Sequence, residues 1–230
     1  MIKTDSYRLY QGDCLTILPK IPDKKIKCLC CDPPYGIDFQ SHRRKTTEYF
    51  EKIANDKKPF IDFIPLVLPK LSDSGCGFIF TRWDVQQVFI DELKKYGVIV
   101  KNILIWNKGV HSMGDLKQSF GSTYESIIFF ANEKFSFTLK RPQDIIYVNR
   151  VHPDKLVHPN EKPVKLIEIL LNYVTKPNDW VLDCFMGSGS CGVACMNTKR
   201  RFCGIEYNKD YFKLSTDRIK DASNSLFANI

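Results

Sequence analysis

The chain has 230 residues, of which 43% are hydrophobic and 26% charged, and this length suits one sizeable α/β domain rather than two. No apolar run reaches membrane-spanning length and the first residues contain no signal-peptide core, so we expect a soluble, cytoplasmic protein without a membrane partner. The net charge of +8, from 34 basic and 26 acidic residues, is compatible with a polyanionic partner, although many basic proteins bind none.

Nine cysteines are present, and most lie inside apolar runs such as residues 27–31 and 181–185. We therefore expect free thiols that pack as small hydrophobic side chains in a reducing compartment. A zinc site would need two well-spaced pairs of ligands. Cys191 and Cys195, one helical turn apart, have no second such pair, so we expect no metal.

The first elements of the chain are short. Residues 7–10 are predicted to form a strand, and residues 15–18 a brief helix that follows Gly12 and Asp13. Asp13 is suited to cap that helix, which is a common use of aspartate before a first turn. Residues 26–31 form an apolar run typical of a buried strand.

Asp32, Pro33, Pro34 and Tyr35 follow that strand directly. Two prolines can neither donate to a sheet ladder nor continue a helix, so the strand must end and expose an acid, a rigid turn and an aromatic ring. Ligands bind at the carboxyl edge of open α/β sheets. An acid and a fixed carbonyl can accept both hydrogens of an exocyclic amino group, while a tyrosine offers a face to a flat base. An ordinary Asp-Pro turn with a packing tyrosine explains the four residues equally well.

Residues 40–58 carry six lysines and arginines and few core-forming residues. We interpret this segment as a mobile, solvated loop with some helix near residues 48–54. Its position directly after the proline turn favours a lid or a phosphate-gripping role at least as much as a charged surface without contacts.

The middle of the chain alternates between helical and strand patterns. Such alternation predicts parallel strands with helices on both faces of a sheet. Val85, Val88, Phe89 and Leu93 are predicted to share one face of a helix. The predicted helices cover residues 60–71 and 84–96, and the predicted strands cover residues 75–81, 98–106 and 126–131.

Residues 107–123 break this pattern with three glycines, and so long an irregular stretch is usually functional or disordered. Residues 135–148 alternate weakly, as in a small hairpin. Phe135, Phe137 and Tyr147 alternate with basic residues, which suits a nucleic-acid surface as well as an ordinary half-buried hairpin. The basic residues are Lys134, Lys140, Arg141 and Arg150.

Residues 158–163 open a strongly amphipathic helix, and Pro163 suits its first turn. The apolar spacing predicts that this helix buries one stripe of side chains. The stripe consists of Leu166, Ile167, Leu170 and Tyr173.

The last third of the chain has a strand, a glycine turn, a helix and a second strand that ends at Glu206. Glycines let the backbone approach a ligand, and an acid about twenty residues later suits ribose hydroxyls, so this is the layout of a nucleoside-binding βαβ unit. Gly192 stands at the third glycine position of a dinucleotide fingerprint, but no pyrophosphate site is otherwise implied. A plain strand, turn and helix in the core is the alternative interpretation. The elements are residues 180–185, 186–190, 191–197 and 201–205.

These motifs together resemble the amino-group DNA methyltransferases that use S-adenosyl-L-methionine, in particular those of the β motif order, in which the catalytic turn precedes the cofactor glycine turn. The resemblance implies a Rossmann-like methyltransferase fold: a mostly parallel sheet of the seven-stranded type with helices on both faces. It also implies one catalytic domain over residues 1–230, with the mobile basic loop 40–58 and a small target-recognition insert at about 109–152. The matching segments are residues 12–13, 32–35, 105–108, 158–163, 183–190 and 204–206.

The resemblance also implies the roles of individual residues. Residues 32–35 would form the catalytic turn, with Asp32 and the Pro33 carbonyl on the target amino group. The methionine part of the cofactor would lie over the glycine turn, with Lys162 near its carboxylate, while Glu206 would hold the ribose. The implied catalytic residues are Asp32, Pro33, Pro34 and Tyr35, and the implied cofactor-binding residues are Asp13, Asp32, Lys162, Asp183, Phe185, Gly187, Ser188, Gly189 and Glu206.

A base inside a duplex cannot reach such a pocket, so the target nucleotide of double-stranded DNA would flip out and stack on Tyr35. In the resembling family an Asp at the first position of the turn is commoner in adenine enzymes and a Ser in cytosine enzymes, so we expect adenine-N6, with cytosine-N4 as the alternative. The same motifs would also suit a catalytically inactive DNA-binding subunit, or an RNA or protein-amide methyltransferase. A homodimer and a cognate restriction endonuclease are further partners that the resemblance allows.

Overall fold

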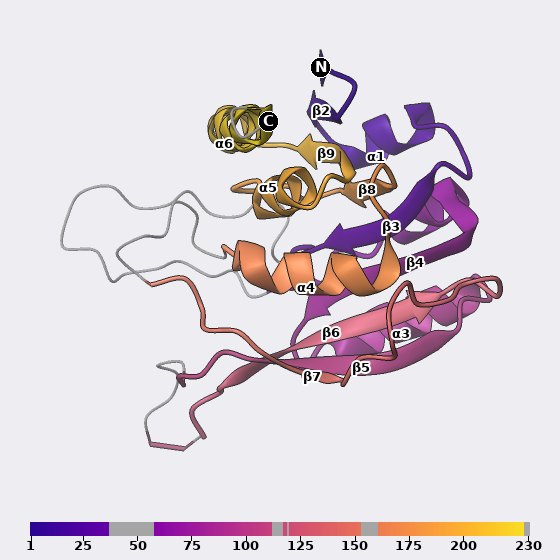
Figure 1. Cartoon of the computed structure of the whole chain (residues 1–230). Helices are drawn as coiled ribbons and strands as arrows, with labels where there is room; N and C mark the ends of the chain where they lie inside the picture. Colours follow the sequence, from indigo (N-terminus) through magenta and orange to yellow (C-terminus); the bar gives the residue numbers. More distant parts are fainter. Residues whose placement is uncertain (37–57, 112–116, 119, 153–160, 228–230) are drawn as a thin grey trace.

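The computed structural model describes residues 1–36, 58–111, 117–118, 120–152 and 161–227. Within these residues a single nine-stranded sheet runs through the molecule (Figure 1). Residues 40–57 of the predicted basic loop 40–58 lie outside them, and so does the helix predicted near residues 48–54. In spatial order the strands are β1 (Ile2–Lys3), β2 (Tyr7–Gln11), β9 (Arg201–Glu206), β8 (Trp180–Asp183), β3 (Ile26–Cys31), β4 (Leu71–Thr81), β6 (Tyr124–Ala131), β5 (Val100–Asn107) and β7 (Ile145–Tyr147).

Seven of the nine described strands run in one direction, and β1 and β6 run against them. The mostly parallel, Rossmann-like sheet expected from the resemblance is therefore confirmed. The expectation of parallel pairing is wrong for β6, which is antiparallel to both β4 and β5. Parallel neighbours need a crossover connection, usually a helix. The described part of the connection between β5 and β6 contains no helix.

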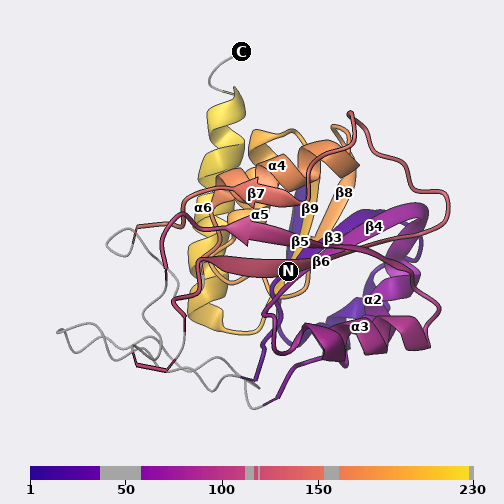
Figure 2. The ribbon, with the colours of Figure 1, turned by 90° about the horizontal axis from the view of Figure 1, so that it is seen from below.

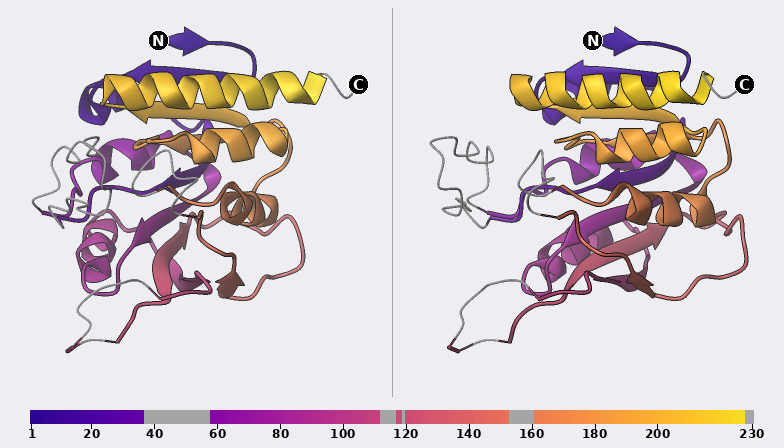
Figure 3. Two further views of the ribbon diagram at one scale, coloured as in Figure 1. Left: turned by 90° about the vertical axis from the view of Figure 1, so that its left-hand side faces the viewer. Right: turned by 60° about the vertical axis from the view of Figure 1, so that its left-hand side comes forward.

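Helices cover both faces of the sheet, as Figure 2 shows. Successive side chains of a strand point to opposite faces. Cys30 and Phe78 accordingly pack beneath α4, α5 and α6, whereas Leu29 and Ile79 pack against α1, α2 and α3. In Figure 3 the helices α4, α5 and α6, drawn in orange to yellow, lie side by side over one face of the sheet. The helices are α1 (Cys14–Ile17), η1 (Leu18–Lys20), α2 (Ile64–Val67), η2 (Leu68–Lys70), α3 (Gln86–Lys95), α4 (Val164–Val174), α5 (Ser190–Asn197) and α6 (Lys209–Phe227), of which η1 and η2 are 3-10 helices.

All nine cysteines are buried free thiols in these two core layers, as predicted. The described residues contain no group of three or more His, Cys, Asp or Glu side chains placed to hold a metal ion. Within the same part of the chain, no helix is long and apolar enough to cross a membrane.

The helix predicted at residues 60–71 is shorter than expected. Only Ile64–Val67 is α-helical, and the 3-10 helix η2 follows it. Pro69 lacks the N–H that would continue the α-helical ladder, so the α-helix ends before it. The chain then enters β4 at Leu71, four residues before the predicted start of that strand at residue 75.

The hairpin predicted at residues 135–148 is wrong. Only Ile145–Tyr147 is a strand, and it pairs in parallel with β5. Phe135 and Phe137 instead pack on Phe129, with ring centroids 5.5 and 5.9 Å away. Aromatic packing on the core accounts for the apolar alternation that suggested a hairpin.

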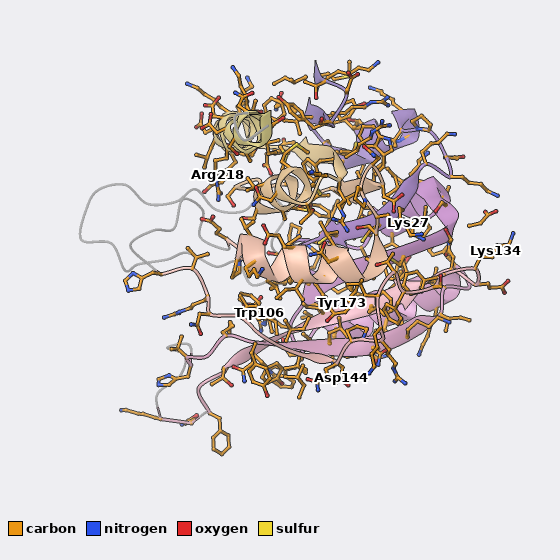
Figure 4. The ribbon with its side chains drawn as sticks, in the orientation of Figure 1. Lys27, Trp106, Lys134, Asp144, Tyr173 and Arg218 are labelled. Carbon is orange, nitrogen blue, oxygen red and sulfur yellow. The ribbon has the colours of Figure 1, made fainter. Side chains whose placement is uncertain are left out.

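The segment between β6 and β7 begins at the edge of the sheet where the parallel strands start. Asn132 N donates to the carbonyl of Gly75, and Lys134 Nζ lies 3.8 Å from Asp73 Oδ2. In Figure 4 Lys134 lies on the right with Lys27, which is near the start of β3. Further along, Thr138 N donates to the carbonyl of Tyr173 near the end of α4. Part of the predicted target-recognition insert is therefore far from the end of β3.

Strand β1 and the long helix α6 were not predicted from the sequence. Gly192 explains how α6 packs against α5, because a Cβ there would lie 2.4 Å from Ile219 Cδ1. The third glycine of the fingerprint pattern thus permits close helix packing.

Leu93→Ala should lower the free energy of unfolding by about 2–5 kcal/mol, because Leu93 is fully buried on α3. Val88→Ala on the same helix should change it by less than about 0.5 kcal/mol. Val88 was predicted to face the core, but it is 42% exposed. Urea denaturation measures both values, and equal losses in the two variants would contradict this packing.

Candidate active site

Acidic residues follow four neighbouring strands at one edge of the sheet. The strands β2, β9, β8 and β3 are parallel neighbours, so their carboxyl ends lie together. Asp13 comes shortly after β2, Glu206 and Asp183 end β9 and β8, and Asp32 follows β3. The proline turn and the glycine turn therefore meet at the same edge of the sheet, as the sequence analysis predicts.

Asp32 is held by Lys162, which is only 9% exposed. Lys162 Nζ donates to Asp32 Oδ2 at 2.6 Å and lies 3.2 Å from Glu125 Oε2. Its ammonium also stands 5.4 Å from the centre of the Phe80 ring. The predicted catalytic acid and a predicted cofactor residue thus form one partly buried ion cluster, to which Glu125 belongs.

Opposite charges keep Lys162 and Glu125 ionised. Burial alone would lower the pKa of Lys162, but the carboxylates of Asp32 and Glu125 outweigh it and raise that pKa above its ordinary value. Burial alone would raise the pKa of Glu125, but Lys162 and Lys108 outweigh it and lower that pKa. Lys162 is therefore a cation and Glu125 an anion at neutral pH.

The proline turn is tied to the chain at residues 59–60. Phe60 N donates to the carbonyl of Pro34 at 3.0 Å, and Tyr35 forms a bridge with Pro59. Tyr35 is 8% exposed, because it packs in the core layer that contains Phe63. The expectation of an exposed aromatic ring is thus wrong for this structure. A base can stack on Tyr35 only after neighbouring residues move.

The glycine turn is bound to Glu206. Gly187 N donates to Glu206 Oε2 at 2.7 Å, and Asn208 N donates to Oε1 at 2.8 Å. Gly189 has φ of +81°, in the left-handed region, and a Cβ there would lie 2.8 Å from Ser215 Cβ. Only glycine fits at this position, and its left-handed conformation lets the turn lead directly into α5, which begins at Ser190.

Burial makes the two acids beside the glycine turn hard to ionise. It raises the pKa of Asp183 to about 8, although Phe185 N donates to the Asp183 carboxylate at 3.0 Å. Burial also raises the pKa of Glu206, against the N–H groups of Asn208 and Gly187. Both carboxylates would be stabilised by a nearby positive charge. These residues therefore fit a ligand that carries a sulfonium and an ammonium group.

Arg218 of α6 joins two of the predicted motifs. Its Nη1 donates to the carbonyl of Ser188 at 2.8 Å, and its Nη2 donates to Glu161 Oε1 at 2.7 Å. Figure 4 shows Arg218 on the left, beside α5 and α6. Glu161 belongs to the motif at residues 158–163, of which residues 158–160 lie outside the described residues. Arg218 was not predicted as a site residue, because α6 is not evident from the sequence pattern.

The remaining predicted cofactor residues make local contacts. Asp13 Oδ1 accepts from Leu15 N at 2.9 Å and so caps α1. The Phe185 ring packs edge-on against Phe60 and Phe63, with centroids 5.8 and 5.0 Å away. The buried hydroxyl of Ser188 lies 3.3 Å from the Ser190 hydroxyl. These contacts hold the two turns in shape, and the roles of the residues toward a cofactor stay predictions.

Glu125 and Lys108 were not predicted as site residues. Lys108 lies in the matching segment 105–108, and its Nζ is 3.4 Å from Glu125 Oε1. Glu125 directly precedes the buried part of β6, which begins at the site edge because β6 is antiparallel. Had β6 been parallel, as expected, Glu125 would lie at the opposite edge.

Comparison with known proteins places the chain among DNA methylases. The family model N6_N4_Mtase, described as DNA methylase, matches residues 26–217. The chain is 25% identical to the Type II methyltransferase M1.MboII of Moraxella bovis in an alignment of 257 positions, gaps included, that covers 89% of this chain and 93% of that protein.

Two solved structures share its fold. The crystal structure of the M1.HpyAVI–SAM complex matches with a TM-score of 0.71 and 26% identity, over 92% of this chain and 99% of that chain. The PvuII DNA methyltransferase, which is cytosine-N4-specific, also matches with a TM-score of 0.71, at 17% identity, over 96% of this chain and 93% of that chain.

The free energy of unfolding should fall as the pH rises from about 4 to about 8, and this fall should be smaller in the Asp183→Asn variant than in the wild type. The unfolded chain releases this proton near pH 3.8, whereas the folded protein keeps it up to about pH 8. The side chain thus contributes stability that is fully present at low pH and is lost through this window, at up to about 1.4 kcal/mol per pH unit. The amide that replaces the carboxyl group carries no titrating proton. Denaturation of both proteins across this range measures the effect, and identical pH profiles would contradict it.

Proposed function

Because the chain belongs to the N6/N4 family of DNA methylases, we propose that it methylates the N6 amino group of an adenine flipped out of a specific duplex sequence. Amino-group DNA methylation with S-adenosyl-L-methionine follows from the family and from the SAM complex of a relative. The adenine, the flipped base and the residue roles are the proposal.

The observation that supports these roles is the juxtaposition of two turns. Asp32 at the end of β3 lies beside the glycine turn at the end of β8, and these strands are directly paired. The glycine turn has buried acids that suit a positively charged cofactor. The proline turn has an aspartate side chain paired with Lys162 and a rigid backbone. A donor and an acceptor of a methyl group could thus be held at one edge.

The chemistry needs alignment more than a strong base. A base amino group is a poor nucleophile because its lone pair is delocalised into the ring. Hydrogen bonds from that group to Asp32 and to the Pro33 carbonyl would favour a pyramidal nitrogen whose lone pair is free to react. When bound, S-adenosyl-L-methionine would supply an electrophilic methyl group on a sulfonium and leave as the neutral thioether, and the glycine turn, Asp183 and Glu206 would hold it in place. The amino nitrogen loses one proton as it gains the methyl group, and the Asp32 carboxylate, which accepts a hydrogen bond from that group, would receive it.

Double-stranded DNA is the partner in this proposal. Flipping a nucleotide costs a few kcal/mol, which contacts to the backbone must offset. Residues 108–111, 120–123 and 148–152 lie where β5 and β7 end and β6 begins, at the same edge as Asp32. Phe120 and Tyr147 are exposed there. Exposed aromatic rings suit stacking with unpaired bases, and we propose this edge, with the basic loop 40–58, as the DNA-contacting surface.

The adenine assignment rests on Asp32 at the first position of the turn, by resemblance. The matching family includes N6 and N4 enzymes, so cytosine-N4 is the alternative product. A homodimer and a cognate restriction endonuclease stay predictions from the resemblance.

Incubation with labelled cofactor and DNA, followed by mass analysis of the digested nucleosides, should yield N6-methyldeoxyadenosine. N4-methyldeoxycytidine would overturn the adenine assignment. Cofactor and DNA binding without any methylated nucleoside would instead identify a catalytically inactive DNA-binding subunit.

In the same assay Asp32→Asn should lower kcat about 100-fold. A neutral amide accepts a hydrogen bond from the target amino group less strongly than a carboxylate does, and it cannot form an ion pair with Lys162. Asp73→Asn is the matched control, since Asp73 is an exposed acid that binds Lys24 and Lys134 at the other edge of the sheet. Activity of the Asp32→Asn variant close to that of the control would argue against a catalytic role for Asp32.

Replacing Lys134, Lys140 and Arg141 together by Ala should leave the choice of methylated sequence unchanged, because this segment starts at the edge opposite Asp32. Arg150→Ala should weaken DNA binding and reduce its salt dependence, because Arg150 is exposed just after β7 at the site edge. Competition between DNA sequences at several salt concentrations measures both effects. If the triple variant methylated a wider range of sequences, this result would support a recognition role for the whole insert predicted at about 109–152.

A further inference from the structure

We propose that Glu125 is a positioning residue for the methyl transfer, which acts through Lys162 to keep Asp32 available to the target amino group. The inference rests on the proposed function and adds a residue that the motifs do not single out.

Four side chains form a row of alternating charge at the site edge. Lys108 Nζ lies 3.4 Å from Glu125 Oε1, Glu125 Oε2 lies 3.2 Å from Lys162 Nζ, and Lys162 Nζ lies 2.6 Å from Asp32 Oδ2. The row crosses from the end of β5 and the start of β6 to the end of β3. It links Lys108 of the 105–108 motif to Asp32 of the proline turn through Glu125 and Lys162.

Lys162 is fixed at one place in this row. Its side chain is 10% exposed, and the Phe80 ring lies 5.4 Å from its ammonium. A lysine side chain has a flexible four-carbon stem and a compact charge, so it follows whichever partners surround it. Here the Lys162 ammonium is shared between the carboxylates of Asp32 and Glu125.

Sharing the ammonium has a consequence for Asp32. With Glu125 present, one positive charge is divided between two carboxylates, so Lys162 takes up less of the hydrogen-bonding capacity of Asp32. Without the Glu125 charge, the ammonium would be drawn wholly onto Asp32 and would compete there with the target amino group. Glu125 itself lies on β6, separated from β3 by β4, and so acts on Asp32 through Lys162.

The decisive variant is Glu125→Gln, which keeps the shape of the side chain and removes its charge. We expect kcat for methyl transfer to fall about tenfold or more, with KM values for S-adenosyl-L-methionine and DNA within about twofold of the wild type. Glu125→Asp, which restores the charge on a shorter side chain, should recover part of the loss.

A double-mutant cycle with Lys162→Met tests the route of the effect. If Glu125 acts through Lys162, Glu125→Gln should cause no further loss of kcat in the Lys162→Met background. The matched control is Glu92→Gln, because Glu92 is also buried and pairs with a lysine, Lys95 at 2.6 Å, but on α3 away from the site. Its kcat should stay at the wild-type value. Thermal melting of every variant shows whether it is folded under the assay conditions.

The outcomes are separable. A wild-type protein that methylates DNA, with a Glu125→Gln variant of equal kcat, would overturn the inference and leave the proposed function standing. A loss of kcat that is equally large in the Lys162→Met background would also overturn it, because Glu125 would then act independently. A wild-type protein without methyl transfer would overturn the proposed function and this inference with it.

Discussion

The parallel pairing of β3 with β8 is the constraint on which the site depends. Cys28 lies opposite Val181 and Leu29 opposite Leu182, so the turns that follow the two strands emerge side by side. One turn is made rigid by two prolines, and the other depends on a glycine in the left-handed region. Because both strands are buried between helix layers, the pairing cannot shift without exposing core residues.

The two halves of this edge differ in their electrostatics. On the β3 side, Asp32 and Glu125 are matched by Lys162 and Lys108, so that half is balanced by the protein's own charges. On the β8 side, Asp183 and Glu206 are held by backbone N–H groups, and burial raises the pKa of both. A positive ligand is thus favoured beside the glycine turn, whereas Asp32 of the proline turn already accepts a hydrogen bond from Lys162.

Glu125 reaches the site on β6, the strand that was predicted to be parallel and is antiparallel. A strand's apolar pattern is the same whether the strand runs parallel or antiparallel, so residues 126–131 carried no information on which end meets the site. Arg218 was missed for a different reason. It lies on a helix that was not predicted, and its contacts with Ser188 and Glu161 join segments far apart in the chain.

The sequence by itself determined the central strands, the proline turn, the glycine turn and their order, because prolines, glycines and buried apolar runs act on the backbone within a few residues. These were sufficient to indicate the family and the edge of the sheet. Only the tertiary structure decided the direction of β6, the burial of Tyr35 and the ion pairs of Lys162. Each of these depends on packing between segments that are distant in sequence, which a local pattern does not encode.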